Sequence, residues 1–172
     1  AIKDGVRFDK TYDGNANVMQ TLAKGTNYTL EGFATGEGTG IELHSGTGKY
    51  ADKNAAADKD VTFDDLSLTG EGAANYVLNK TALTGKGTIA QRELMLAAVA
   101  GKTFDKTYDG TTNVTAVLKK GENYTLSNFA DGEGEGITIT GAGSYADKNV
   151  GKKAVNFAGL ALKGEGAGNY RL

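Results

Sequence analysis

The sequence predicts an all-β protein made of two tandem, small, β-sandwich-like repeat modules arranged end to end. Three observations predict this fold class. Glycine accounts for 26 of the 172 residues and proline for none, apolar and polar residues alternate in short runs, and most of the chain occurs twice. Alternation with period two is typical of half-buried strands, and glycine supplies the positive φ angles that tight turns between such strands require.

An internal repeat sets the domain organisation. Residues 8–14 read Phe-Asp-Lys-Thr-Tyr-Asp-Gly and recur at residues 104–110, 104 − 8 = 96 positions later. Further matches pair residues 27–30 with 123–126, 50–54 with 145–149, and 74–78 with 168–172. We therefore expect a first module over residues 1–88 and a second over residues 89–172, with a connector strand at about residues 89–100.

Aromatic residues form the frame of the repeat. Each of the six Phe and eight Tyr residues has a counterpart in the other copy, whereas His44 faces Thr140 and Met19 faces Thr115. Rings at matching positions predict two equivalent cores, each burying a large apolar area. The alternative is that some Tyr rings form an exposed platform on which sugars stack.

Short alternating runs predict the strands along the first module. Apolar residues at every second position occur in residues 28–30, 41–43, 61–63, 66–68 and 76–78. Glycine-containing turns separate these runs, at residues 13–14, 24–25, 36–38, 46–48 and 70–72. Strands this short, with turns this frequent, favour a sandwich or a similar two-layer β-module.

The connector is ambiguous between helix and strand. Residues 90–100 are mostly strong helix formers. They lie between modules otherwise built of strands, however, and their continuous apolar run also suits a strand covered on both faces. We expect a strand with Leu94, Met95, Leu96 and Val99 buried, which would tie the connector to a module and make the pair a semi-rigid rod.

Composition and charge exclude several classes of partner. The formal net charge is −2, with Lys and Arg scattered singly among Asp and Glu, which argues against nucleic acid and anionic membranes. Without cysteine, neither a disulfide nor a thiolate metal site can form. No apolar run approaches the roughly 20 residues that span a bilayer, and no signal sequence follows Ala1. We expect no membrane insertion by this segment, and a longer parent polypeptide.

Three motifs occur in both copies, and we expect each to be structural. In the Tyr-Asp-Gly motif, Tyr anchors a corner in the core, Asp accepts backbone N–H groups of the turn, and Gly supplies positive φ. The other two are a central Tyr-Ala-Asp-Lys-Asn and a closing Asn-Tyr-x-Leu. The motif residues are Tyr12, Asp13, Gly14, Tyr50, Asn54, Asn75 and Tyr76 in the first copy and Tyr108, Asp109, Gly110, Tyr145, Asn149, Asn169 and Tyr170 in the second.

Candidates for catalysis are few. His44 is the only histidine; it occupies a polar position of its strand, and we expect it to be exposed. The acidic pair Asp64-Asp65 would suit a glycosidase, but the second copy has Ala158-Gly159 there. No nucleophile with a base occurs in both copies, so we expect no enzyme.

The glycine-rich loops at residues 35–40 and 131–136 carry carboxylates, which are ligands that Ca²⁺ prefers. The acidic residues differ between the copies and lack the spacing of an EF-hand loop. We expect solvated hairpin tips, and no cofactor.

The Lys-Thr-Tyr-Asp-Gly opening, the Tyr-Ala-Asp-Lys-Asn centre and the Asn-Tyr-x-Leu close together resemble the YDG-type repeat, a glycine-rich, mostly β repeat of bacterial surface proteins. The resemblance covers almost the whole chain, twice, although the proline that often precedes the family's connecting strand is missing. It implies a segment of a large, secreted adhesin similar to filamentous haemagglutinin, exported by two-partner secretion to the cell surface or the medium. The implied role is a stalk that supports cell attachment, aggregation or biofilm formation. The alternative is that the modules themselves bind glycan, biofilm matrix or neighbouring adhesin copies through exposed Tyr residues.

Overall fold

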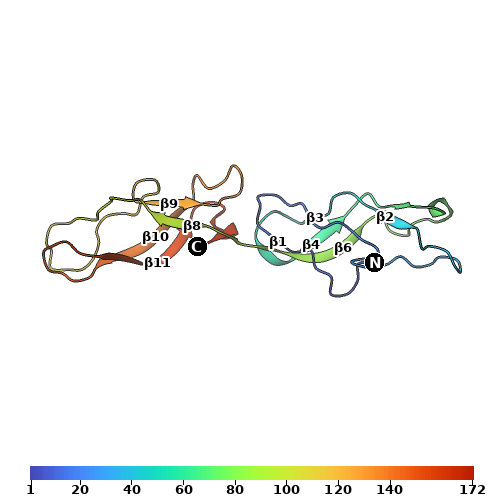
Figure 1. Cartoon of the computed structure of the whole chain (residues 1–172), viewed down its shortest axis with the longest axis horizontal. Coiled ribbons are helices and arrows are strands. Elements are labelled where there is room, and N and C mark those ends of the chain that lie inside the picture. Colours follow the sequence, from blue (N-terminus) through green and yellow to red (C-terminus); the bar gives the residue numbers. More distant parts are fainter. The chain divides into compact units, whose positions relative to one another are not determined.

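The structure is all-β, as the sequence predicts, and its only other elements are two short 3-10 turns. The computed structural model describes residues 1–172 and contains two compact units, Ala1–Gln91 and Arg92–Leu172 (Figure 1). The boundary between the units follows Gln91, whereas the repeat pattern places it after residue 88. No helix has the length and apolar character needed to span a membrane. The end-to-end placement of the modules stays a prediction.

A four-stranded sheet forms the larger part of the first unit, in the order β1-β6-β4-β3. Its strands are β1 Lys10–Thr11, β3 Lys49–Tyr50, β4 Ala56–Phe63 and β6 Leu83–Ala90. β6 lies between β4, to which it is antiparallel, and β1, to which it is parallel. Leu83, Gly87 and Ile89 of β6 are buried while Thr84 and Lys86 are exposed, so β6 covers one side of the core.

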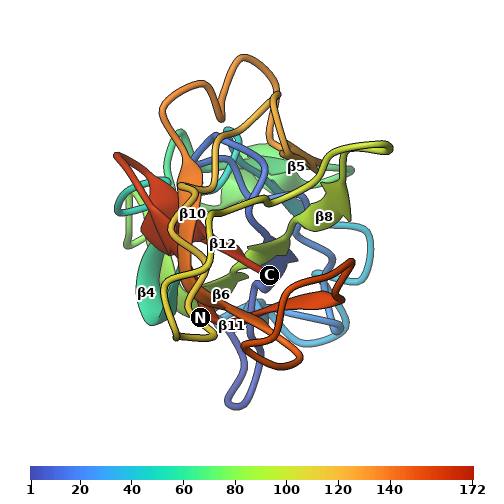
Figure 2. The same ribbon diagram turned by 90° about the vertical axis from the view of Figure 1, so that its left-hand side faces the viewer.

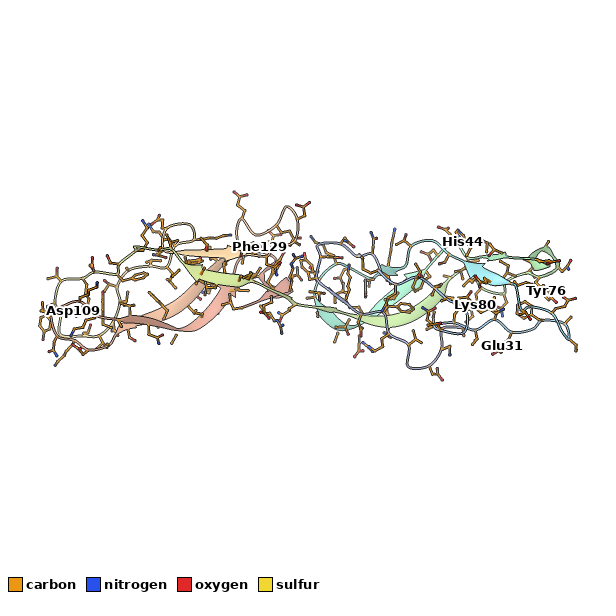
Figure 3. All side chains as sticks on the ribbon, in the orientation of Figure 1. Glu31, His44, Tyr76, Lys80, Asp109 and Phe129 are labelled. Atoms are coloured by element: carbon orange, nitrogen blue, oxygen red, sulfur yellow. The ribbon has the colours of Figure 1, made fainter.

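A two-stranded sheet completes the first unit. β2 Glu42–His44 pairs antiparallel with β5 Ser67–Thr69, and the 3-10 turn η1 Ala73–Asn75 follows. Leu43 is buried and His44 is exposed, which confirms the prediction for the only histidine (Figure 3).

The second unit repeats this plan around one long hairpin. β10 Thr138–Tyr145 pairs antiparallel with β11 Val155–Lys163, and the two lie side by side in Figures 1 and 2. β10 joins the counterparts of β2 and β3 in one strand, and β11 joins those of β4 and β5. A register shift between Thr140 and Ala142 falls where the second copy has lost one residue.

The remaining strands of the second unit form two small sheets. β8 Met95–Ala98 pairs antiparallel with β9 Tyr124–Ser127. β7 Arg92–Glu93 pairs parallel with β12 Tyr170–Arg171, which follows the 3-10 turn η2 Ala167–Asn169.

Each unit has its own aromatic and aliphatic core. The largest fully buried side chains of the first unit are Phe8, Tyr12, Tyr28, Ile41, Val61, Phe63 and Ile89. Those buried in the second unit are Leu94, Tyr124, Leu126, Ala130, Ile137, Ile139 and Tyr170. The prediction of equivalent cores is wrong in one region, because Tyr12 is 1% exposed and its counterpart Tyr108 is 58% exposed. The sheets give the reason: β4 pairs with both β3 and β6, whereas its counterpart β11 pairs with β10 alone.

The connector is extended, so the strand prediction is confirmed and the helix alternative is wrong. Leu94, between β7 and β8, is 3% exposed, and its N–H donates to the Arg171 carbonyl at 2.7 Å. The expected burial of Met95 and Leu96 is wrong, since they are 67% and 37% exposed, and Val99 is half-buried. The physical reason is that β8 pairs with β9 alone and none of its side chains is buried by a second layer.

Candidate functional site

A lysine holds the Tyr-Asp-Gly corner of the first unit. Lys10 Nζ lies 2.7 Å from Asp13 Oδ1 and 5.5 Å from the centroid of the Tyr50 ring. Asp13 Oδ1 also accepts the backbone N–H of Asn15 at 3.1 Å, and Gly14 has φ 86°. The predicted roles of Asp as the acceptor for the turn and of Gly as the residue with positive φ are confirmed here.

The second unit repeats this corner. Lys106 Nζ lies 2.7 Å from Asp109 Oδ1 and 5.3 Å from the centroid of the Tyr145 ring. Asp109 accepts the N–H of Thr111 at 2.9 Å, and Gly110 has φ 77°. The hydrogen bond from Lys106, followed by those from Thr111, lowers the pKa of Asp109 to about 2. The carboxylate therefore stays ionised and accepts the hydrogen bonds that fix the turn. Its role is structural.

The Tyr of each central motif ties the start of its repeat to the sheet. The Tyr50 hydroxyl donates to the Phe8 carbonyl at 2.5 Å, and the Tyr145 hydroxyl donates to the Phe104 carbonyl in the same way. The opening and central motifs, far apart in sequence, therefore meet at one place in each unit.

The rest of the central motif is a loop closed by its own aspartate. Asp52 accepts the N–H of Asn54 at 2.8 Å, and Asp147 accepts that of Asn149 at 2.8 Å. Both Asn side chains are exposed. In the first unit, Lys59 on β4 also pairs with Asp52 at 2.7 Å, and Lys153 pairs with Asp147 at 2.8 Å in the second. These contacts fix the backbone of Asn54 and Asn149 in the turn.

The closing motif reaches across its unit to a glycine-rich loop. The Tyr76 hydroxyl accepts the N–H of Ala34 at 3.1 Å and donates to Glu37 Oε2 at 2.5 Å. Tyr170 makes the matching contacts with Ala130 at 3.1 Å and Glu133 at 2.7 Å. The preceding residues end the 3-10 turns: Asn75 is exposed, and Asn169 is buried.

Sequence reasoning missed a lysine that fills each glycine-rich loop. Lys24 Nζ donates to the carbonyls of Gly38 at 2.5 Å and Ile41 at 2.8 Å, and it lies 5.2 Å from the centroid of the Phe33 ring. The counterpart Lys120 donates to the equivalent carbonyls, Gly134 and Ile137, and lies 4.8 Å from the Phe129 ring. The signal was present in the sequence, because both lysines occupy the same position of the repeat. An ammonium group thus takes the carbonyl oxygens of the loops considered for Ca²⁺, and no group of three or more metal-ligating side chains occurs.

Two surfaces differ between the repeats, and the one at the Tyr-Asp-Gly corner is the candidate site. In the second unit, Phe104, Tyr108, Tyr145 and Val155 line a cavity of about 490 Å³. We call these four residues the aromatic groove. Phe104, Tyr145 and Val155 are half-buried and Tyr108 is exposed, so the expected core role of Tyr108 is wrong. Figure 3 places Asp109, beside this groove, and Phe129 at opposite ends of the unit.

In the first unit, β6 fills the corresponding space. Phe8 N–H donates to the Lys86 carbonyl at 3.0 Å, and Tyr12 N–H donates to the Ala90 carbonyl at 2.8 Å. Ile89 is 1% exposed. The four counterparts of the groove residues, Phe8, Tyr12, Tyr50 and Val61, are all buried beneath this strand.

The opposite end shows the reverse relationship. In the second unit β7 pairs with β12, and Tyr170 of β12 is buried. In the first unit Tyr76 is only half-buried and Val77 is exposed, and both line a second cavity of about 700 Å³. The continuous segment of residues 83–93 thus covers one end of each unit, through β6 in the first and β7 in the second.

Two successive all-β units with the same motifs, and with matching contacts around those motifs, define a tandem-repeat protein. The chain belongs to the YDG domain family, which matches residues 1–84 and again residues 91–172. No curated protein and no solved structure matches the chain.

Proposed function

We propose that this chain is a structural segment of a large, secreted bacterial surface adhesin and acts as a stalk that supports attachment, aggregation or biofilm formation. The connector is the observation that carries the proposal. β6 lies in the main sheet of the first unit, β7 and β8 lie in sheets of the second, and only Gln91 separates β6 from β7. One segment completes a repeat and begins the next, as expected of an array whose repeats contact their neighbours.

The contacts common to both units support the same proposal. They are the lysine–aspartate corner, the central Tyr hydroxyl on a carbonyl, and the lysine within the glycine-rich loop. All of these contacts fix the conformation of the backbone, and none of them presents a reactive group. Extracellular location and two-partner secretion belong to this proposal and rest on the resemblance to adhesin repeats.

Surface display tests the stalk function. Increasing numbers of copies of the chain are placed between a bacterial surface anchor and a tip epitope, with Gly/Ser linkers of equal residue number as the matched control. Folded repeats should carry the epitope farther from the cell than a flexible linker, whose span grows only with about the square root of its length. If large antibody-coated beads reach the epitope no better than with the Gly/Ser linker, the stalk function is wrong.

The end-to-end arrangement needs its own measurement. Small-angle scattering of the chain should give a narrow distribution of distances between the units, and a Gly/Ser insertion after Gln91 should broaden it. A compact particle, or a distribution that the insertion leaves unchanged, would contradict the arrangement.

A second candidate function is binding of glycan, matrix or a neighbouring adhesin copy by the modules themselves. The observation that favours it is the aromatic groove, where the Tyr108 ring is exposed beside Phe104 and Tyr145. Against it, the matching rings of the first unit are covered by β6. A glycan array probed with the chain and with Tyr108→Ala tests it: binding that the variant loses at unchanged melting temperature favours the binding function over the stalk.

A further inference from the structure

We propose that the aromatic groove of the second unit is a docking site for a β-strand with the sequence pattern of Leu83–Ala90, donated by another YDG repeat. The first unit supplies the argument, because there a strand of this pattern is seated on the same four ring and valine positions. The proposal does not depend on the stalk function.

The walls of the groove are already in place without the strand. Phe104 and Phe157 pack with ring centroids 4.8 Å apart, against 4.9 Å for Phe8 and Phe63 in the covered unit. The hydrogen bond from the Tyr145 hydroxyl to the Phe104 carbonyl is also present. A preformed site loses little conformational entropy when its partner binds.

The backbone around the groove has free hydrogen-bonding positions. In the first unit the N–H groups of Phe8 and Tyr12 donate to β6, whereas the N–H groups of Phe104 and Tyr108 have no backbone acceptor. β11 pairs on one side only. An open strand edge beside a groove lined by aromatic rings and lysine side chains is an arrangement on which an extended segment adds as a further strand.

The pairing seen in the first unit gives the register of the donor strand. There Leu83 lies opposite Phe63 and Gly85 opposite Val61. On the second unit the same residues would lie opposite Phe157 and Val155. Ile89, which pairs with Lys10 on the parallel side, would lie opposite Lys106.

Glycines make the site selective for this pattern. A Cβ at Gly87 would lie 1.9 Å from the Phe8 carbonyl oxygen and 2.9 Å from the Tyr50 ring, and one at Gly85 would lie 3.0 Å from the Phe8 ring. The donor must therefore carry glycine at the Gly87 position, and the Gly85 position leaves room for no more than a small residue; both lie between the buried Leu83 and Ile89. An ordinary alternating strand would clash with the corresponding carbonyl of Phe104.

A peptide in trans tests the proposal on the full chain. The probe is a synthetic peptide of residues 79–91, and its control carries Gly87→Val. Amide NMR signals of residues 104–108 and 155–157 should shift saturably with the probe, and binding of the control should be at least about tenfold weaker, since overpacking at such a contact is not relieved cheaply. Equal binding of the two peptides, or shifts confined to the first unit, would overturn the proposal.

A tethered donor covers the case in which the free peptide binds weakly. Leu172 corresponds to Leu78, so residues 79–91 appended after Leu172 take the spacing that β6 has in the first unit, at a high effective concentration. The melting temperature of the second unit should rise by about 5 °C or more, and Tyr108 should become protected from iodination. The appended segment with Gly87→Val should give neither effect.

Three outcomes of the tethered experiment count against the proposal. An unchanged melting temperature overturns it. So does an equal rise with the valine variant, because the glycine contacts would then not matter. Concentration-dependent dimerisation of the unmodified chain, with the groove amides shifted and no response to the tether, would make a second whole copy the occupant instead.

Discussion

The backbone N–H of Tyr12 donates to the carbonyl oxygen of Ala90 at 2.8 Å. This bond joins the corner motif of the first repeat to the connector that leads out of it. Tyr108 occupies the same position of the second repeat, has no such partner and is exposed. One motif thus contributes a core residue in one unit and a surface residue in the other.

Tyr12→Ala should destabilise the first unit by about 3–5 kcal/mol, because it removes a fully buried ring. Tyr108→Ala is the matched control and should change the free energy of unfolding of the second unit by no more than about 0.5 kcal/mol. Urea unfolding followed through amide signals of each unit measures both. Equal losses would contradict the difference in burial.

Leu94→Ala should destabilise the second unit by about 2–5 kcal/mol, since Leu94 is the buried residue of the connector. Met95→Ala changes the neighbouring, exposed residue and should cost about 0.5 kcal/mol or less. Thermal unfolding of the two variants compares them. A large effect of Met95→Ala would restore the prediction that the whole apolar run is buried.

Lys24→Met keeps the length of the side chain but removes the ammonium group that binds the Gly38 and Ile41 carbonyls. Leaving these acceptors without a donor should cost about 1–3 kcal/mol. Lys80→Met, at an exposed residue in Figure 3, is the control and should be neutral. Denaturant titration of the first unit decides the outcome, and a neutral Lys24→Met would show that water replaces the ammonium group.

Acid should weaken the second unit partly through Asp109. Its pKa is lowered from 3.8 to about 2 in the folded state by Lys106 and Thr111. The stabilising contribution of the ionised carboxylate is therefore fully present above the unfolded pKa and is lost as the pH falls from 3.8 towards 2. Asp109→Asn should reduce the fall in melting temperature over this range, whereas Asp131→Asn, at an exposed residue outside any ion pair, should not. Identical pH profiles for Asp109→Asn and the unchanged chain would rule out the contribution.

The melting temperature should be the same in EDTA and in excess Ca²⁺. The Glu37 carboxylate accepts the Tyr76 hydroxyl, and Lys24 holds the carbonyls of the same loop, so a bound Ca²⁺ would have to displace an ammonium group. Calorimetry measures the difference, and Mg²⁺ serves as the control for a general ionic effect. A rise of several degrees specific to Ca²⁺ would identify the loops as cation sites.

Local sequence patterns predicted the all-β class, the exposed His44 and the capped Tyr-Asp-Gly turns, because each follows from local chemistry. Period-two alternation, glycine at positive φ and aspartate beside backbone N–H groups act over a few residues. The extended connector was predicted from its neighbours, against its helix-forming composition. The exposure of Met95 was not predictable in this way, because it depends on whether a second layer covers β8.

What the sequence determined by itself was a frame repeated twice, with its strands, turns and matching rings. The tertiary structure decided which copies of those rings are buried, because burial requires a strand to lie over them: β6 lies over Tyr12, and no strand lies over Tyr108. It also decided the partners of Lys24 and Lys120, whose carbonyl acceptors come from a loop that the sequence marks only as glycine-rich. Identical motifs specify identical local geometry, whereas the groove arises from non-local pairing that the motifs do not encode.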